Sequence, residues 1–514
     1  MTIALSRRHL LRGTAAAAAG GMLTALDRSA LAQTTARTPI QLNAVTRTLD
    51  VKGKPAAVLG VMQGNGLSGV FLDPGERFLV DLVNRLNEDT IVHWHGQTPP
   101  VAQDGVAQTG EEKVIVPGAT ARYDYAARPG TYWMHSHQGL QELQLMSAPL
   151  IVRTAEDRKE DAQEVTVILH DFTFKTPEEV MKDVAGSMAG MGSGGATGSD
   201  QTAAKPATEG GGTMGAMPGM ANMSGMAKGS AMPAGMKPGM QMGGDKPDLN
   251  DFDYDAYLAN DRTLDDPMVV RTERNGRVHL RLINGSSSTI FWIELEGAEG
   301  TLVAVDGDRV HPIRGRRFPM AEAQRCDFMI DVPAGKTVAV LAQREGDRVR
   351  TGIILAAPGA AVVRIPELAM KPSEAMGISL EARLTALEPL AARPVGRRIP
   401  VVLGGTMSPY AWSINGRNWA NREPLRVTKG QRVVLEFVNQ TPMGHPMHLH
   451  GHVFQVVELN GTALNGALRD TVQVPAKGSV KVAFDADNPG RWLLHCHNLL
   501  HMETGMITEV IYET

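Results

Sequence analysis

The chain of 514 residues contains only two cysteines, Cys326 and Cys496, which excludes the class of small extracellular domains held together by many disulfides. Its formal net charge of -4 lacks the basic excess that proteins binding nucleic acid usually carry. Beyond the N-terminal segment, no apolar run approaches the ~18 residues that a membrane-spanning helix needs. We therefore expect a soluble monomer whose partners are small molecules, ions or other proteins, with no nucleic acid and no stable membrane insertion.

The N-terminal segment 1–32 has the pattern of an export signal. Arg7 and Arg8 precede the weakly apolar run TAAAAAGGMLTAL, and Ala30 and Ala32 supply small residues at a cleavage site. Paired arginines before a mildly apolar core are typical of twin-arginine export, although an ordinary secretory signal or a disordered arginine-bearing tail is an alternative. We predict that segment 1–32 is a twin-arginine signal peptide and that the mature protein is periplasmic.

Short apolar runs bounded by Gly, Pro, Asn and Asp recur along the chain and predict an all-β fold of barrels or sandwiches. The segments 73–96, 273–295 and 428–451 share one order of features: glycine, a charged residue, an apolar strand, Asn, a loop and a second strand. A repeat at this wide spacing indicates three related β-domains, the alternative being chance similarity of hairpins. The shared residues are Asn84, Asn284 and Asn439.

We predict domain boundaries at polar linkers. The first domain covers 33–156, the second covers 157–368, and a linker with the third domain covers 369–514. The second domain is interrupted by segment 187–245, which consists largely of Gly, Ala, Ser and Met and has no aromatic residue. Such a composition cannot form a packed core, so we expect a flexible insertion.

Ten of the 15 histidines lie in four short clusters, each of which contains a His-x-His pair. Alternate residues of a strand face the same side, so each pair presents two imidazoles together, and neutral imidazole is a common metal ligand. Histidines with purely structural roles would be scattered, as His170, His279 and His311 are. The sequence therefore predicts metal binding by His93, His95, His135, His137, His445, His448, His450, His495, His497 and His501.

Cys496 stands between two histidines and must face the opposite side of its strand from both. A thiolate, two imidazoles and a weak thioether make the electron-transfer site of blue copper proteins, and Cys496, His445, His501 and Met506 can supply these groups. Structural zinc usually has paired cysteines, whereas Cys326 is distant in sequence and is interpreted as a buried apolar residue. The other eight histidines suffice for three more ions, with the division among them left open.

These four motifs resemble the signature of the multicopper oxidase family, which includes laccases and bacterial cuprous oxidases. The likeness covers about residues 40–514. It implies three cupredoxin-like Greek-key domains, four copper ions and the one-electron oxidation of a donor coupled to four-electron reduction of dioxygen to water. The implied ligands are His445, Cys496, His501 and Met506 for type 1 copper, His93 and His448 for type 2, and His95, His135, His497, His137, His450 and His495 for the type 3 pair.

The resemblance also implies carboxyl groups that deliver protons to the dioxygen site. Asp104 matches one of them. A second family carboxylate directly follows the last type 1 histidine, where this chain has Met502, and Glu503 stands one position further on. The candidate catalytic residues are therefore Cys496 for electron transfer and Asp104 and Glu503 for proton delivery.

The insertion suggests which electron donor is used. It holds eleven methionines, and thioether sulfur selects Cu(I). Met443 resembles a Cu(I)-docking methionine of bacterial cuprous oxidases, although Thr441 replaces its expected acidic partner. The candidate Cu(I)-handling residues are Met214, Met217, Met220, Met223, Met226 and Met443.

Three functions fit these observations. The first is a copper-tolerance oxidase of Cu(I) with additional labile Cu(I) at the insertion, the second is a laccase-like oxidase of small aromatic reductants, and the third is a non-enzymatic copper store. The insertion could also be a low-complexity linker without a metal role. We favour the Cu(I) oxidase, because storage alone does not need a His-Cys-His strand.

Overall fold

The computed structural model describes residues 38–186, 249–273 and 276–513. The predicted signal peptide and the methionine-rich segment 187–245, with Met214, Met217, Met220, Met223 and Met226, lie outside these ranges. The predicted all-β class is confirmed, because strands arranged in six sheets make up most of the described regular structure. Within these residues, no helix has both the length and the apolar character needed to cross a bilayer.

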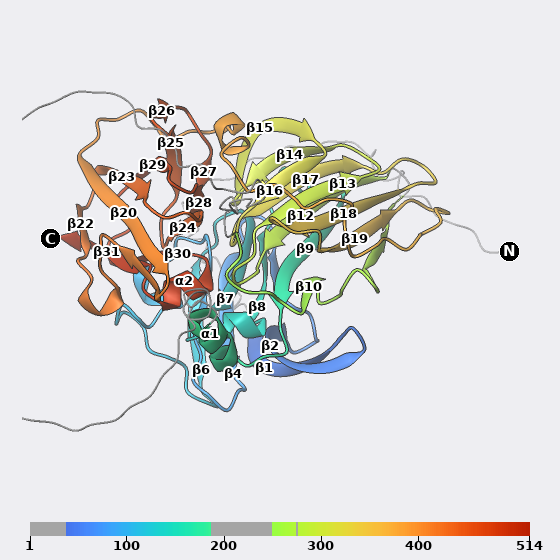
Figure 1. Ribbon diagram of the computed structural model, residues 1–514, viewed down its shortest axis with the longest axis horizontal. Helices are drawn as coiled ribbons and strands as arrows, with labels where there is room; N and C mark the ends of the chain where they lie inside the picture. Colours follow the sequence, from blue (N-terminus) through green and yellow to red (C-terminus); the bar gives the residue numbers. More distant parts are fainter. Residues whose placement is uncertain (1–37, 187–248, 274–275, 514) are drawn as a thin grey trace, which may run out of the picture. The chain divides into compact units, whose positions relative to one another are not determined.

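The strands fall into three groups of two sheets each (Figure 1). The first group comprises β1 (Ile40–Val51), β2 (Lys54–Gln63), β3 (Val70–Leu72), β4 (Arg77–Asn84), β5 (Val92–His93), β6 (Thr120–Ala126), β7 (Gly130–Ser136) and β8 (Ser147–Val152). The second comprises β9 (Gln163–Phe172), β10 (Ala256–Ala259), β11 (Val269–Arg271), β12 (Arg277–Asn284), β13 (Phe291–Glu296), β14 (Gly300–Val305), β15 (Asp308–Gly315), β16 (Arg317–Met320), β17 (Arg325–Asp331), β18 (Thr337–Arg344) and β19 (Arg350–Ala356). The third comprises β20 (Arg397–Met407), β21 (Tyr410–Ile414), β22 (Leu425–Thr428), β23 (Arg432–Asn439), β24 (His445–Leu449), β25 (Phe454–Leu459), β26 (Thr462–Ala463), β27 (Leu468–Arg469), β28 (Thr471–Val474), β29 (Ser479–Asp485), β30 (Arg491–Cys496) and β31 (Ile507–Glu513).

The three groups share a topology. The first strand of each pairs in parallel with the strand that ends at the repeated asparagine, as β1 does with β4, β9 with β12 and β20 with β23. A second parallel pair occurs in each companion sheet, as β3 with β8, β11 with β19 and β22 with β31. The remaining ladders are antiparallel, and apolar side chains of the two sheets meet in a core within each group. The sequence repeat is therefore a repeat of fold.

The repeated asparagine plays the same part in all three groups. The side-chain amides of Asn84, Asn284 and Asn439 donate to main-chain oxygens of the following loop. Each Oδ1 accepts the N–H of the residue two positions on, at 2.9, 3.2 and 2.8 Å. An amide side chain supplies both N–H donors and an oxygen acceptor, so one residue bonds the buried loop in both directions. We call this set of side-chain hydrogen bonds the asparagine clamp. In the third group, the asparagine clamp fixes Met443 and the start of the strand that begins at His445.

Two α-helices lie next to each other among these strands, α1 (Pro177–Gly186) and α2 (Leu499–Glu503) (Figure 1). Val180 and Val184 of α1 share one apolar cluster with Phe252 and with Leu500 and Met502 of α2. The described residues on both sides of segment 187–248 thus pack against α2, the helix that carries His501.

Candidate metal centres

Eight of the clustered histidines come from the first and third groups of strands and lie together in the interior. Strand register brings them into contact, because His93 is opposite His135 in the β5–β7 ladder and His448 is opposite His495 in the β24–β30 ladder. None of the eight side chains is more than 2% exposed. Burial also lowers the pKa of seven of these imidazoles below its usual value, and a neutral imidazole is the form that binds metal: His95, His135, His137, His448, His450, His495 and His497.

Most inward ring nitrogens of these histidines have no hydrogen-bond partner, whereas His450 Nε2 and His495 Nε2 lie 3.0 Å from each other. Six of them are buried without a partner: His93 Nε2, His95 Nδ1, His135 Nε2, His137 Nε2, His448 Nε2 and His497 Nε2. A buried polar atom without a partner costs about 1–3 kcal/mol, so six converging nitrogens need a common ligand. Ligand nitrogens lie within 4.8 Å of one another in three sets: His93, His95 and His448; His95, His135 and His497; His137, His450 and His495. This donor set fits metal ions held by imidazole.

Asp104 holds two of these rings by their outer nitrogens. His93 Nδ1 donates to the main-chain oxygen of Asp104 at 2.8 Å, and His450 Nδ1 donates to its carboxylate Oδ2 at 2.8 Å. Asp104 follows a short 3-10 turn, is 4% exposed, and its other carboxylate oxygen has no partner. Hydrogen bonds of this kind fix the tautomer and orientation of a metal-binding imidazole. The structure thus places the sequence-predicted Asp104 against the histidine cluster.

Two further carboxylates of this kind escaped the sequence analysis. Asp470 accepts a hydrogen bond from His95 Nε2 at 2.9 Å and forms a buried ion pair with Arg325 of the second group. Glu142 Oε2 lies 2.8 Å from His135 Nδ1. Burial raises the pKa of Glu142 well above its usual value. No spacing pattern in the sequence predicts a contact of Asp470 or Glu142 with the histidines, because each residue reaches the cluster through a turn.

Cys496 belongs to a second cluster, on the other face of β30. Its Sγ lies 3.7 Å from His445 Nδ1 and 3.6 Å from His501 Nδ1, and the two nitrogens are 3.1 Å apart. All three side chains are fully buried, as is Met506, whose main-chain oxygen accepts the N–H of Cys496. Burial raises the pKa of the thiol, with a further contribution from the Glu322 carboxyl. A thiol that is costly to ionise, set against two imidazoles, suits a metal that would stabilise the thiolate.

The outer edges of both imidazoles in this second cluster are covered. His445 Nε2 donates to Thr441 Oγ1 at 2.7 Å. His501 Nε2 donates to Asp251 Oδ1 at 3.1 Å, and Asp251 also accepts from Tyr410 at 2.8 Å. Asp251 lies just after the undescribed segment 187–248 and gave no signal in the sequence. Neither imidazole edge is open to solvent.

Three positions considered in the sequence analysis lie near α2 and the second cluster, namely Met502, Glu503 and Met443. Met502, where a family carboxylate was expected, is 7% exposed and packs against α1. Glu503 is exposed at the end of α2, where partial burial and the Glu142 carboxyl raise its pKa. Met443 is 4% exposed and lies two residues before His445. Glu503 is therefore near the surface, whereas Asp104 and Glu142 contact the histidines.

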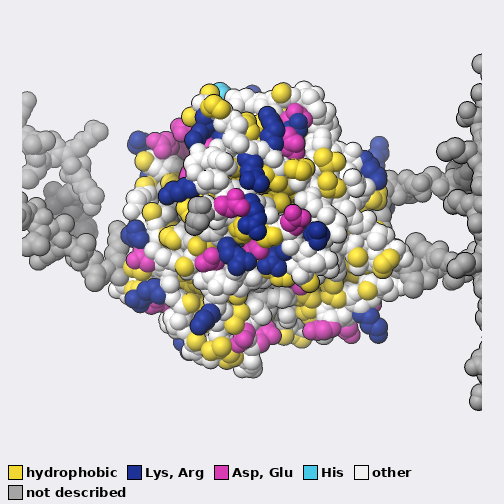
Figure 2. All heavy atoms as spheres, turned by 90° about the vertical axis from the view of Figure 1, so that its left-hand side faces the viewer, with side chains coloured by type: hydrophobic (Ala, Val, Ile, Leu, Met, Phe, Trp, Pro, Cys, Tyr) yellow, Lys and Arg dark blue, Asp and Glu magenta, His cyan; other side chains and the backbone are white. Residues whose placement is uncertain are grey.

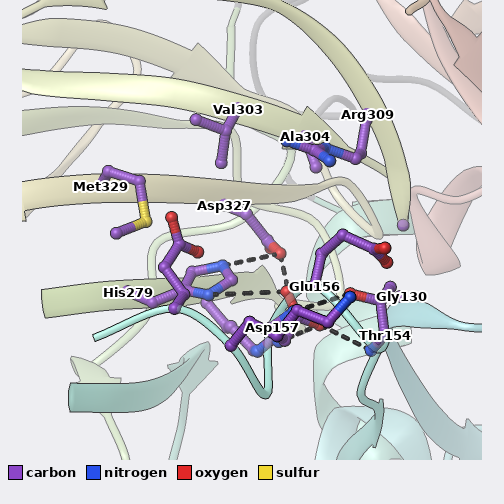
Figure 3. A pocket seen from close by; sticks show the side chains of 14 residues that line it. Gly130, Thr154, Glu156, Asp157, His279, Val303, Ala304, Arg309, Asp327 and Met329 are labelled. Atoms are coloured by element: carbon purple, nitrogen blue, oxygen red, sulfur yellow. Dashed lines mark hydrogen bonds and ion pairs between the residues drawn. The ribbon is translucent and has the colours of Figure 1, made fainter. Parts of the chain in front are cut away.

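Other parts of the described surface carry no comparable cluster of partnerless ligands. A cavity of about 340 Å³ is lined by a scattered histidine, His279, and the buried charges around this histidine pair with one another (Figure 3). His279 lies 3.3 Å from Asp327, and Arg281 bonds both Asp327 and Asp157. On the face formed by the third group of strands, acidic and basic side chains are intermingled and histidine shows only at the upper rim (Figure 2).

Comparison with known proteins agrees with this geometry. Three family models, each described as multicopper oxidase, match residues 47–157, 163–357 and 394–514. The chain is 30% identical to multicopper oxidase MmcO of Mycobacterium tuberculosis, over 97% of this chain and 92% of that protein. It is 25% identical to copper resistance protein A of Escherichia coli over the full length of both.

A solved structure supports the fold. The crystal structure of Fet3p, a multicopper oxidase that functions in iron import, matches with a TM-score of 0.70 at 17% identity, over 93% of this chain and 90% of that chain. Such neighbours have cupredoxin-like domains, which confirms the predicted fold class. The chain belongs to the multicopper oxidase family, the copper-dependent oxidoreductases that use dioxygen as electron acceptor.

Proposed function

We propose that the protein is a four-copper periplasmic oxidase that takes single electrons from Cu(I), reduces dioxygen to water and thereby contributes to copper tolerance. The observation that carries the copper assignment is the convergence of six partnerless imidazole nitrogens beside a separate Cys-His-His cluster. The proposed ligands are His445, Cys496, His501 and Met506 for type 1 copper, His93 and His448 for type 2, His95, His135 and His497 for one type 3 ion, and His137, His450 and His495 for the other.

Copper bound at these positions would supply the one-electron chemistry, and the protein supplies the route between its two clusters. Cys496 is covalently linked to His495 and His497, which belong to the other cluster. His495 Nδ1 also donates to the main-chain oxygen of Cys496 at 2.9 Å. An electron that enters at Cys496 therefore reaches the second cluster through a few bonds of one strand.

We propose Asp104 as the residue that passes protons to the dioxygen site. Its Oδ2 accepts the hydrogen bond from His450, and its Oδ1, 3.4 Å from His93 Nδ1, accepts no hydrogen bond. Each dioxygen reduced to two waters requires four protons, so a sealed cluster needs such a group. Glu503, near the surface, is a proposed point of proton entry from solvent.

Two features favour Cu(I) over a large aromatic donor. Asp251 and Thr441 cover the imidazole edges through which a phenol would make contact. Described residues on both sides of segment 187–248, which holds the eleven methionines, share an apolar cluster with α2, the helix that carries His501. The relative named copper resistance protein A is consistent with this choice. A laccase-like activity on small aromatic reductants is the second candidate, because the family includes such oxidases.

Oxygen-consumption kinetics test the proposal. The holoenzyme is assayed with Cu(I) and with a phenolic donor, and Cys496→Ser serves as the variant without an electron path. We expect Cu(I)-dependent oxygen uptake that Cys496→Ser abolishes, together with loss of copper protection in cells. Efficient phenol oxidation without cuprous activity favours the laccase-like function. Full protection by Cys496→Ser favours a copper store.

A further inference from the structure

Arg325, the first residue of β17, is fully buried at a point where side chains of all three groups of strands meet. Its guanidinium donates two hydrogen bonds to the carboxylate of Asp470 in the third group. Its Nε donates to the main-chain oxygen of Thr131, in β7 of the first group, at 3.2 Å. Its main-chain N–H donates to Asp306 Oδ1, within the second group, at 2.9 Å. One side chain of the second group therefore contacts both of the groups that supply the eight clustered histidines.

Asp470 passes this contact on to two of the proposed copper ligands. Its Oδ1 accepts a hydrogen bond from His95 Nε2 at 2.9 Å, and its main-chain oxygen accepts one from His448 Nδ1 at 2.8 Å. Thr471 Oγ1 also donates to Asp470 Oδ1 at 2.9 Å. His95 belongs to the first group of strands and His448 to the third. A displaced Asp470 would therefore release the outer nitrogen of one ligand from each group.

His95 faces the cluster differently from the other histidines with partnerless nitrogens. Its inward nitrogen is Nδ1, whereas the other five present Nε2. The hydrogen bond to Asp470 holds the proton of His95 on Nε2, so the lone pair of Nδ1 is left for a metal ion. An acceptor on the outer nitrogen fixes both the tautomer and the ring orientation of a metal-binding imidazole. The unusual orientation of His95 thus depends on a correctly placed carboxylate.

The main chain next to His95 fits closely around the ion pair of Arg325 and Asp470. Gly96 has a φ of 84°, and a Cβ at this position would lie 2.7 Å from Asp470 Oδ2 and 2.8 Å from Arg325 Nη2. Both distances are shorter than van der Waals contact, so a larger residue would push the ion pair away from the strand. The glycine that ends the motif HWHG therefore lets the ion pair pack directly against the chain that carries His95.

We propose that Arg325 is a positioning residue of the dioxygen site, through which the second group of strands holds Asp470 and thereby orients His95 and His448. The inference rests on the proposed ligand sets, in which His95 binds a type 3 ion and His448 the type 2 ion. The planar guanidinium makes two parallel hydrogen bonds, so it fixes the plane of the carboxylate as well as its position. The second group, which supplies none of the eight histidines, takes part in the site in this way.

Copper content and spectra of the purified full-length protein test positioning apart from turnover. Arg325→Met leaves the buried carboxylate without its cation, so the double variant Arg325→Met/Asp470→Asn, which removes both charges, is measured beside it. In both variants we expect the type 2 ion and the type 3 ion at His95 to bind about 10–100-fold more weakly. Dialysis against a chelator should then remove the type 2 electron paramagnetic resonance signal and the near-ultraviolet type 3 band. The visible band of the Cys496 cluster should remain.

Arg325→Lys and Arg281→Met are the comparisons. Lysine keeps the charge without the planar fork, so Arg325→Lys should recover part of the lost copper. Arg281 is an equally buried arginine of the second group, which donates to Thr131 Oγ1 and to Asp327 at 2.9 Å each. Asp327 lies beside His279, which is not a proposed ligand. Arg281→Met should therefore lower the thermal midpoint and keep all the copper signals.

The outcomes separate this inference from the proposed function. Wild-type copper content and spectra in Arg325→Met and in the double variant overturn the positioning role, as does an equal loss of copper signals in Arg281→Met. Cuprous oxidation by the wild type would still uphold the proposed function in either case. Selective loss of type 2 and type 3 copper in the Arg325 variants upholds the positioning role, even where the wild type does not oxidise Cu(I). Should Arg325→Met fail to fold, the double variant and Arg325→Lys decide the question.

Discussion

Asp251 accepts hydrogen bonds from His501, Tyr410 and Asn498, so β21 and the capped helix α2 of the third group meet at one carboxylate. A carboxylate that receives the outer N–H of a metal-binding imidazole fixes its ring orientation and raises its basicity. Asp251 also covers the edge of His501 that a bulky donor would have to touch. One side chain therefore both orients the proposed copper ligand His501 and covers the outer edge of its ring.

Replacing Asp251 by alanine should lower the affinity of the Cys496 cluster for copper about 10–100-fold, because His501 loses its acceptor. Turnover of a bulky phenol per bound type 1 copper should rise, because the imidazole edge is opened. Copper content after dialysis against a chelator and steady-state oxidation of the phenol measure the two effects.

Asp251→Asn is the matched control, since an amide oxygen still accepts the His501 hydrogen bond. Asp253→Ala changes an exposed carboxylate two residues away. An Asp251→Ala protein that keeps wild-type copper affinity would show that Asp251 is not a support for His501.

At the residue scale, the sequence could predict the histidines and Cys496 because a strand alternates its faces. It could not predict Glu142, Asp470 or Asp251. Glu142 returns to the cluster through a turn in which Leu145 has a φ of 66°, and Asp251 and Asp470 come from segments far from the ligands they contact. Such contacts depend on tertiary packing, which the spacing of residues along the sequence does not indicate.

At the scale of elements, the repeated strand and its asparagine could be predicted, because both follow from the order of residues within each repeated segment. The parallel pairing of β1 with β4, β9 with β12 and β20 with β23 was not, because it joins strands separated by other elements. The apolar role of Met502 became clear only when α1 was found to pack against α2.

The asparagine clamps give a prediction at this scale. Replacing Asn439 by aspartate removes the N–H donors that bind the main-chain oxygens of Met443 and Val474 and sets a carboxylate beside them, at a cost of about 1–3 kcal/mol in the free energy of unfolding. We expect a lower thermal midpoint together with a weaker visible absorption band from the Cys496 cluster.

Asn284→Asp is the matched comparison, because the same clamp stands in the group of strands without clustered histidines. It should lower the thermal midpoint by a similar amount and leave the band intact. Equal loss of the band in both variants would mean that the clamp acts on general stability alone.

At the scale of the whole molecule, the proposed dioxygen site joins the first and third groups. The third group also carries the Cys-His-His cluster. Described residues on either side of segment 187–248, Val184 and Phe252, belong to one apolar cluster with Leu500 of α2.

Replacing the eleven methionines of segment 187–245 by glutamine keeps its length and removes its soft donors. We expect kcat/KM for Cu(I) to fall about tenfold, with a much smaller change for a small organic donor. Oxygen uptake at subsaturating donor concentrations measures both. The control replaces an equal number of alanine and serine residues of the segment by glutamine. Parallel losses of kcat/KM with the two donors would contradict a role of the segment in Cu(I) oxidation.

Strand β30 and the residue that follows it carry proposed ligands on both faces, with Cys496 on one and His495 and His497 on the other. A slip of one residue against β24 would turn every side chain to the wrong face and would destroy both clusters at once. Copper can therefore be bound fully only by a chain whose strands have found the correct register. Retention of copper would therefore report directly on the register of β30 against β24.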